Sequence, residues 1–129
     1  MPNSQKKLYR ALCRSMNTRS VGNVGENIAA NYLAKHGYVI LERNFTTHHG
    51  EIDIVAKHGE FFVFVEVKRR KADKFGMPRE AVTPYKQQAI ASCAKFWLVK
   101  NKLYGAPVRF DVVEVMDTEV TLIVDAFRI

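Results

Sequence analysis

Two segments of the chain carry the spacing of helices. In residues 21–33 apolar side chains recur at intervals of three and four, and Gly37 follows at a position suited to end a helix. A second segment, 83–103, begins with Thr83 as a natural N-cap and has Pro84 in its first turn. The sequence therefore predicts two helices. The spacing also predicts that the aromatic residues of the second helix belong to the core: Tyr85, Phe96 and Trp97.

Strand patterns fill most of the chain between and after these helices. Residues 38–45 and 51–57 are predicted as strands separated by a polar turn, and residues 61–67 are apolar on both faces, which is typical of a buried central strand. Residues 108–116 and 120–129 predict a closing pair of strands. The order of helix, three strands, helix and two strands predicts an α/β fold, with a mixed central sheet flanked by helices.

The size and composition suit one globular domain. The chain has 129 residues, of which 47% are hydrophobic, so it can bury a core without a disulfide. No apolar run approaches the roughly 20 residues that span a bilayer, and no membrane association is expected. Residues 1–20 are basic without the apolar stretch of a secretory signal, which favours a cytoplasmic protein. We expect a basic N-terminal arm over 1–20 and a single domain over 21–129.

The positive charge is concentrated in two places. The formal net charge is +7, and the arm of residues 1–20 contains no acid, whereas residues 109–129 are net acidic. A second basic cluster follows the predicted central strand, in a charged segment expected to be a loop: Lys68, Arg69, Arg70, Lys71 and Lys74. Cationic side chains gain free energy by displacing counterions from phosphates, so this asymmetry favours a nucleic-acid partner over a merely solvated basic surface.

Two acids on the second strand form the first candidate for chemistry. Because side chains alternate along a strand, Glu51 and Asp53 are expected on one face, and Ile52 and Ile54 on the other. The twelve residues between Asp53 and Glu66 include a predicted turn, which places these two carboxylates at a similar height on adjacent antiparallel strands.

The central strand ends in a carboxylate and an ammonium group. Glu66 and Lys68 share the face of two phenylalanines, where unpaired charge is costly, so a site must compensate them. A hard cation such as Mg²⁺ or Mn²⁺ takes one or two carboxylates together with phosphate oxygens, which Asp53, Glu66 and the carbonyl of Val67 can supply. Lys68 would then orient the attacking water and stabilise charge on the phosphate oxygens.

Further candidates come from the two helices and a loop. Glu26 shares a helical side with small residues, which suggests a cleft, and Lys86 and Gln87 lie at the start of the second helix, within reach of a phosphate. Glu51 is a secondary candidate. A zinc site at His48 and His49 is disfavoured, because adjacent residues of an extended chain point in opposite directions.

The same residues resemble a known superfamily. Asp53 and the run Glu66-Val67-Lys68 on successive strands, between two helices, resemble the PD-(D/E)XK nuclease core. More closely, residues 21–115 resemble the YraN-like uncharacterised protein family. The segments that carry this resemblance are Gly25-Glu26, Arg43-Asn44, Gly50-Glu51-Ile52-Asp53 and Phe64-Val65-Glu66-Val67-Lys68. The proline of the superfamily's first signature is replaced here by Ile52, which is not a ligand position.

The resemblance implies a restriction-endonuclease-like fold and an activity similar to that of archaeal Holliday-junction resolvases. It implies that Glu26, Asp53 and Glu66 bind metal and that Lys68 is the catalytic lysine. We therefore expect a metal-dependent endonuclease acting on structured or branched DNA, for which a symmetric junction would require a homodimer. Two alternatives stay open: a catalytically silent nucleic-acid-binding module, and a phosphodiesterase with a non-nucleic substrate.

Overall fold

The structure is a computed structural model that describes residues 24–70 and 82–129. The predicted arm of residues 1–20 and the basic residues Lys71 and Lys74 lie outside this part. The described elements follow the predicted order: α2 (Val24–Lys35), β1 (Val39–Thr47), β2 (Gly50–His58), β3 (Phe61–Arg70), α3 (Pro84–Lys100), β4 (Val108–Met116) and β5 (Glu119–Phe127).

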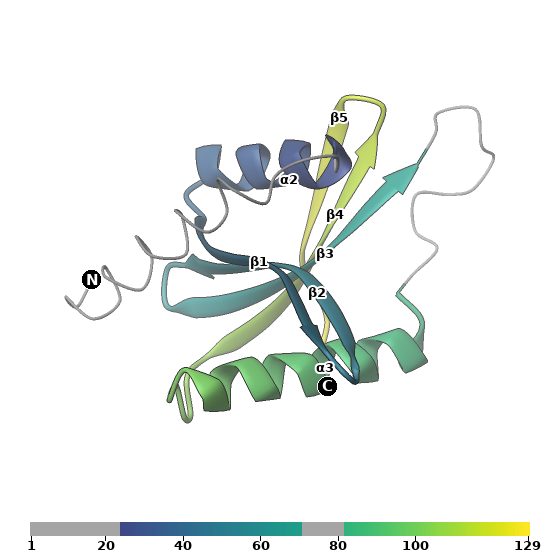
Figure 1. Cartoon of the computed structure of the whole chain (residues 1–129). Helices are drawn as coiled ribbons and strands as arrows, with labels where there is room; N and C mark the ends of the chain where they lie inside the picture. Colours follow the sequence, from purple (N-terminus) through teal and green to yellow (C-terminus); the bar gives the residue numbers. More distant parts are fainter. Residues whose placement is uncertain (1–23, 71–81) are drawn as a thin grey trace.

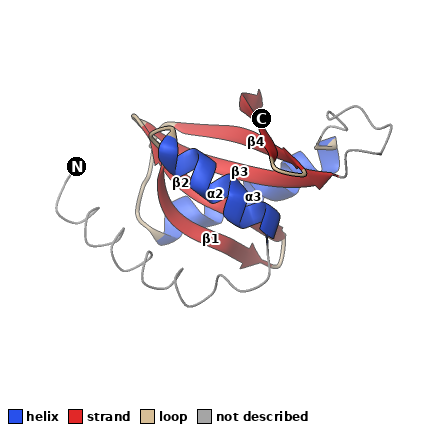
Figure 2. Ribbon diagram, turned by 90° about the horizontal axis from the view of Figure 1, so that it is seen from above, coloured by secondary structure: helices blue, strands red, loops and turns tan. Residues whose placement is uncertain are grey.

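The five strands form one mixed sheet in the order β1-β2-β3-β4-β5. All neighbouring pairs are antiparallel except β3 and β4, which are parallel and are connected through α3. Helices α2 and α3 cover opposite faces of the sheet (Figures 1 and 2). The predicted mixed sheet flanked by helices is confirmed. Neither helix is long and apolar enough to cross a membrane, among the residues that the structure describes.

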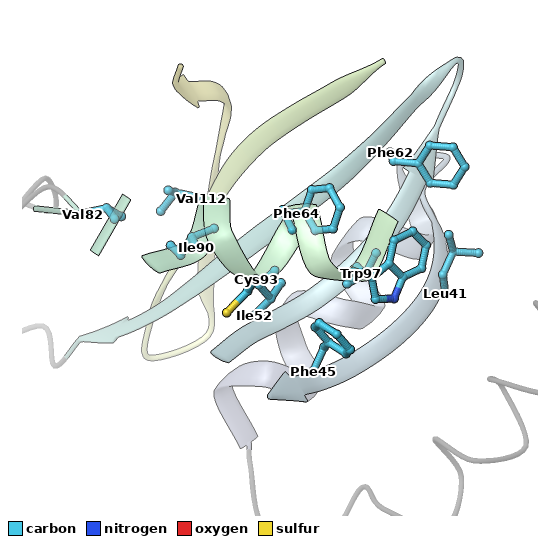
Figure 3. Packing of buried hydrophobic residues seen from close by; sticks show 12 residues of the cluster. Leu41, Phe45, Ile52, Phe62, Phe64, Val82, Ile90, Cys93, Trp97 and Val112 are labelled. Carbon is cyan, nitrogen blue, oxygen red and sulfur yellow. The ribbon is translucent and has the colours of Figure 1, made fainter. Parts of the chain in front are cut away.

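Two buried clusters hold the layers together. The α3 core lies between α3 and the sheet and surrounds the fully buried Trp97, with Phe64 and Cys93 among its members (Figure 3). The α2 core lies on the other face and joins Ala29 and Leu33 of α2 to valines of the central strands. β3 contributes alternate residues to both cores, which explains why its sequence is apolar on both faces.

The boundaries differ from the predicted ones mainly at β3. This strand continues to Arg70, so Arg69 and Arg70 belong to the strand rather than to a loop. Its parallel pairing with β4 continues as far as Arg70 opposite Met116, and these backbone hydrogen bonds extend the strand beyond its apolar segment. Helix α3 begins as predicted, since the side chain of Thr83 accepts a hydrogen bond from the backbone N–H of Lys86.

Candidate functional site

β2 and β3 pair along part of their length and then separate. Their register ends at the pair Ile54 and Val65, beyond which the two strands diverge (Figure 1). A continued register would place Asp53 opposite Glu66. Instead, Oδ2 of Asp53 accepts a hydrogen bond of 2.8 Å from the backbone N–H of Val67. The side chain of Asp53 thus takes the place of a backbone hydrogen-bond partner. We call the region just beyond Ile54 and Val65, where β2 and β3 separate at Asp53 and Glu66, the fork.

The alternation of side chains along β2 also breaks at the fork. Ile52 packs in the α3 core and Ile54 in the α2 core, so the expectation that they share a face is wrong. On β1, Phe45 pairs with Ile52 and Arg43 pairs with Ile54. Asn44 lies between these two residues of β1 and has a left-handed backbone with a φ of 55°. The regular alternation of β2 thus breaks at Asp53, beside this irregular position of β1, which simple strand periodicity cannot anticipate.

Glu66 is held at the fork by the start of α3. Its side chain is 8% exposed, and its Oε2 atom lies 3.2 Å from the Nζ atom of Lys86, a half-exposed residue in the first turn of α3. The sequence placed Lys86 near a phosphate, and the structure places it against a carboxylate of the site. Lys86 therefore offsets one negative charge of the pair formed by Asp53 and Glu66.

Asp53 and Glu66 also influence each other electrostatically. Burial and the neighbouring carboxyl group of Glu66 raise the pKa of Asp53 from 3.8 to about 7, against the opposing effects of the Val67 N–H and of Lys86. Asp53 therefore retains its proton to a higher pH than an ordinary aspartate, and a cation bound to its carboxyl group would displace that proton.

Glu26 and Glu51 lie near this pair and interact with it electrostatically. Glu26 is 2% exposed, and its Oε1 atom lies 2.9 Å from Nε of Arg43, which also donates a hydrogen bond to Asn27. Burial raises the pKa of Glu26 and of Glu51, and the charge of Asp53 contributes to both increases. Across 24–70 and 82–129, no three acidic, histidine or cysteine side chains form a ready-made metal cage.

Glu114, a buried acid beside Lys68, is not among the site residues predicted from the sequence. These two residues are partners in the parallel register of β3 and β4. Glu114 is 5% exposed, and its Oε2 atom is buried with no hydrogen-bond partner in the described chain. The signal that identified Glu66, an acid between valines in an apolar strand, is present in Val113-Glu114-Val115 as well.

Another buried acid, Asp111, shows how a structural carboxylate is normally satisfied. It accepts hydrogen bonds from the hydroxyl group of Tyr38, at 2.7 Å, from the guanidinium group of Arg109 and from the backbone N–H of Asp125. Buried polar atoms in folded proteins are rarely left without such partners. Glu114 differs from Asp111, because its Oε2 atom has no such partner among the described residues.

Two of the residues predicted to contact nucleic acid, Arg69 and Gln87, also make contacts within the protein. Arg69 packs against Gly25 at the start of α2, where an added Cβ atom would lie 3.0 Å from Cδ of Arg69. The side-chain amide of Gln87 donates a hydrogen bond of 2.9 Å to the carbonyl of Val82, so Gln87 supports the chain that enters α3. Both helices begin toward the end of the molecule to which β3 points, with their positive dipole ends on that side (Figure 1).

Two of the three aromatic residues assigned to the core are on the surface. Trp97 is fully buried, as predicted, and its Nε1–H donates a hydrogen bond of 2.9 Å to Glu42. Tyr85 is 87% exposed and Phe96 is 52% exposed, so the prediction is wrong for both. Trp97 lies on the side of α3 that packs with Ile90 and Cys93, whereas Tyr85 and Phe96 lie outside that side.

These features define a class of protein before any particular family. A mixed five-stranded sheet between two helices, with acids at the fork of β2 and β3, is consistent with a restriction-endonuclease-like core. The chain belongs to the family described as "Uncharacterised protein family UPF0102", whose model matches residues 25–115. This confirms the YraN-like resemblance.

Bacterial relatives resemble the chain over most of its length. A UPF0102 protein of Clostridium perfringens strain SM101 is 45% identical over 117 residues, which cover 86% of this chain and 96% of the relative. A UPF0102 protein of Geobacter metallireducens is 48% identical over 101 residues, covering 78% of this chain and 83% of the relative. A UPF0102 protein of Clostridioides difficile strain 630 is 43% identical, covering 87% and 100%.

Proposed function

We propose that this protein is a metal-dependent endonuclease that hydrolyses phosphodiester bonds of DNA, with structured or branched DNA as the substrate class. The observation that carries the proposal is the pair of carboxyl groups of Asp53 and Glu66 at the fork. Burial and Glu66 raise the pKa of Asp53, and a divalent cation bound between the two groups would displace the proton of Asp53. Lys68 follows on the same strand face as Glu66, and the fold keeps two further cations, Lys86 and Arg69, at this end of the molecule.

The residues at the fork fit Mg²⁺ or Mn²⁺. Mg²⁺ commonly binds one or two protein carboxylates and fills its other positions with water and substrate phosphate oxygens. Asp53 and Glu66 would hold the ion, together with the carbonyl of Val67, and Glu26 is a further predicted ligand. When bound, the ion would polarise the phosphate and lower the pKa of a coordinated water.

Basic side chains of the protein would then orient the water, stabilise the developing charge and bind the DNA. Lys68 donates hydrogen bonds that orient the attacking water and that stabilise the negative charge growing on the phosphate oxygens. Lys86, which offsets the charge of Glu66, is near enough to the site to exchange that contact for one with a phosphate oxygen. Arg69 and Arg70, with Lys71 and Lys74, would hold the DNA backbone on either side.

Cleavage assays with defined DNA structures test this proposal. The purified protein is incubated with Mg²⁺ or Mn²⁺ and four-way, flapped, duplex and single-stranded DNA. We expect cleavage that Asp53→Asn, Glu66→Gln and Lys68→Ala each reduce by at least about 100-fold. Glu60→Gln and Lys35→Ala, which change exposed charges, serve as matched controls. Equal cleavage by wild type and by the site variants would reject the proposal.

The second candidate is a nucleic-acid-binding module without catalytic turnover. The contact between Lys86 and Glu66 favours it, because it partly neutralises the acid pair without any metal. Such a module would bind DNA with a steep dependence on salt, and titration calorimetry with Mn²⁺ would show no heat that depends on Asp53.

A further inference from the structure

The outer face of α3 carries an exposed apolar stripe that the proposed active site does not use. Tyr85, Phe96 and Val99 are 87%, 52% and 50% exposed. Together with Ser92 they are separated by seven, four and three residues, so they lie on one side of the helix. Tyr85 and Phe96 are roughly 16 Å apart along the helix axis.

The charge around this stripe has a single sign. From Pro84 to Lys102 the sequence contains Lys86, Lys95, Lys100 and Lys102 and no acidic residue. By helical position, Lys95 and Lys100 flank the stripe on its two sides. The Nζ atom of Lys100 lies 5.7 Å from the ring centre of Phe45, next to Phe96, so this cation is placed beside an aromatic surface.

The stripe begins beside the fork. Tyr85 is adjacent in sequence to Lys86, whose ammonium group contacts Glu66. A nucleic-acid strand whose phosphate lies at the fork could therefore continue along α3 without leaving the protein surface. Exposed aromatic rings between cations are the features with which proteins bind unpaired nucleotides, because bases stack on the rings while the cations contact phosphates.

We propose that the outer face of α3 binds a single-stranded segment of the nucleic acid, with bases stacked on Tyr85 and Phe96 and phosphates near Lys95 and Lys100. This inference rests on the proposed function for its substrate class and extends it, since it assigns the unpaired part of a branched substrate to α3. The paired part would lie on the basic end of β3.

A second copy of the chain is a less suitable occupant. A two-fold interface through this face would set the same lysines of two helices against each other, with no acid on either helix to pair with them. A polyanion, in contrast, is attracted by these lysines. The charge of α3 therefore favours nucleic acid over self-association.

Fluorescence anisotropy in EDTA, with an Asp53→Asn background, measures binding without hydrolysis. The probes are a labelled oligothymidylate and a duplex of equal strand length. We expect Tyr85→Leu and Phe96→Leu, which remain apolar but lose the ring, each to weaken oligothymidylate binding about tenfold. Tyr104→Leu, which removes an exposed ring in the turn after α3, is the matched control and should bind as the parent does.

The lysines are tested through the salt dependence of binding. Each lost phosphate contact lowers the slope of log K against log salt concentration by about 0.7 for a single strand. We expect Lys95→Gln and Lys100→Gln each to reduce the slope by this amount. Lys35→Gln, on the exposed end of α2, should leave it unchanged.

Several outcomes would overturn the inference. They are unchanged oligothymidylate binding by both leucine variants, tighter binding of the duplex with equal sensitivity to them, or a change from dimer to monomer in sedimentation without an effect on DNA. The two proposals can fail separately. Ring-dependent binding without any cleavage by wild type rejects only the nuclease activity, whereas Asp53-dependent cleavage with ring-independent binding rejects only the role of α3.

Discussion

The carboxylate of Asp53 lies 2.8 Å from the backbone nitrogen of Val67 and occupies the place of a missing strand partner. Because burial and Glu66 raise the pKa of Asp53 to about 7, the folded protein retains a proton that an unfolded aspartate releases near its ordinary pKa of 3.8. The folded state thus binds more protons between these two values, and stability falls as the pH rises through that window.

Replacing this carboxyl group should remove the pH dependence. Asp53→Asn keeps an oxygen that can accept the Val67 N–H but cannot ionise. We expect the variant to be more stable than wild type at about pH 8, by on the order of 3 kcal/mol, and nearly equal to it at about pH 4. Urea denaturation at several pH values measures this difference. A variant that is less stable than wild type at high pH would contradict the assigned pKa.

Divalent cations should reverse the loss of stability at high pH. A cation that binds only the folded protein stabilises it by mass action, and it must displace the proton of Asp53 wherever that group is protonated. We expect millimolar Mn²⁺ to raise the melting temperature by several degrees at about pH 8 and much less at about pH 5.5. The Asp53→Asn variant should show neither shift, and an equal shift in wild type and variant would place the cation elsewhere.

Arg43 should be essential for stability, because it opposes the charge of the buried Glu26. Arg43→Gln removes one partner of a buried ion pair, which typically costs about 3 kcal/mol. The loss should be smaller at low pH, since burial raises the pKa of Glu26 and protonation removes its charge. Arg128→Gln, which breaks the exposed pair with Asp125, is the control and should leave the melting temperature unchanged.

Glu114 offers a test of whether a buried acid is retained for activity. Its Oε2 atom lacks a hydrogen-bond partner in the described structure, so Glu114→Gln should not destabilise the fold and is expected to stabilise it by about 1 kcal/mol. If Glu114 positions Lys68, its partner in the strand register, the same variant cleaves more slowly with an unchanged substrate KM.

A matched change at an exposed acid completes this test. Glu119→Gln, on β5, should alter neither stability nor cleavage. Slower cleavage by a more stable Glu114→Gln protein would separate a positioning role from a structural one. Unchanged cleavage would show that Lys68 does not depend on its neighbour.

The order of elements was predictable because it depends on local patterns. Thr83 begins α3 and the apolar run 61–67 forms the central strand, as the sequence indicates. Asp53 and Glu66 were also predictable as candidates, because charged groups in largely apolar strands are costly unless something compensates them. Their closeness follows from the antiparallel hairpin.

Other features depend on contacts that periodicity does not contain. Ile52 packs in the α3 core and Ile54 in the α2 core, next to the left-handed backbone of Asn44, and no alternation rule includes such an irregularity. The contact between Lys86 and Glu66 joins segments that only the packing of α3 brings together. Tyr85 and Phe96 have a spacing compatible with a core, and only the sheet determines which side of α3 is covered.

At the fork, the distance between Asp53 and Glu66 depends on how the backbones of β2 and β3 are placed. Beyond Ile54 and Val65 the described ladder no longer joins the β1–β2 hairpin to the rest of the sheet. The hairpin beyond this point is instead held by α3, because Phe45 and Ile52 pack in the α3 core and the hydroxyl oxygen of Thr47 lies 3.0 Å from the sulfur of Cys93. The packing of α3 against the hairpin therefore also sets the spacing between Asp53 and Glu66, the two residues of the proposed metal site.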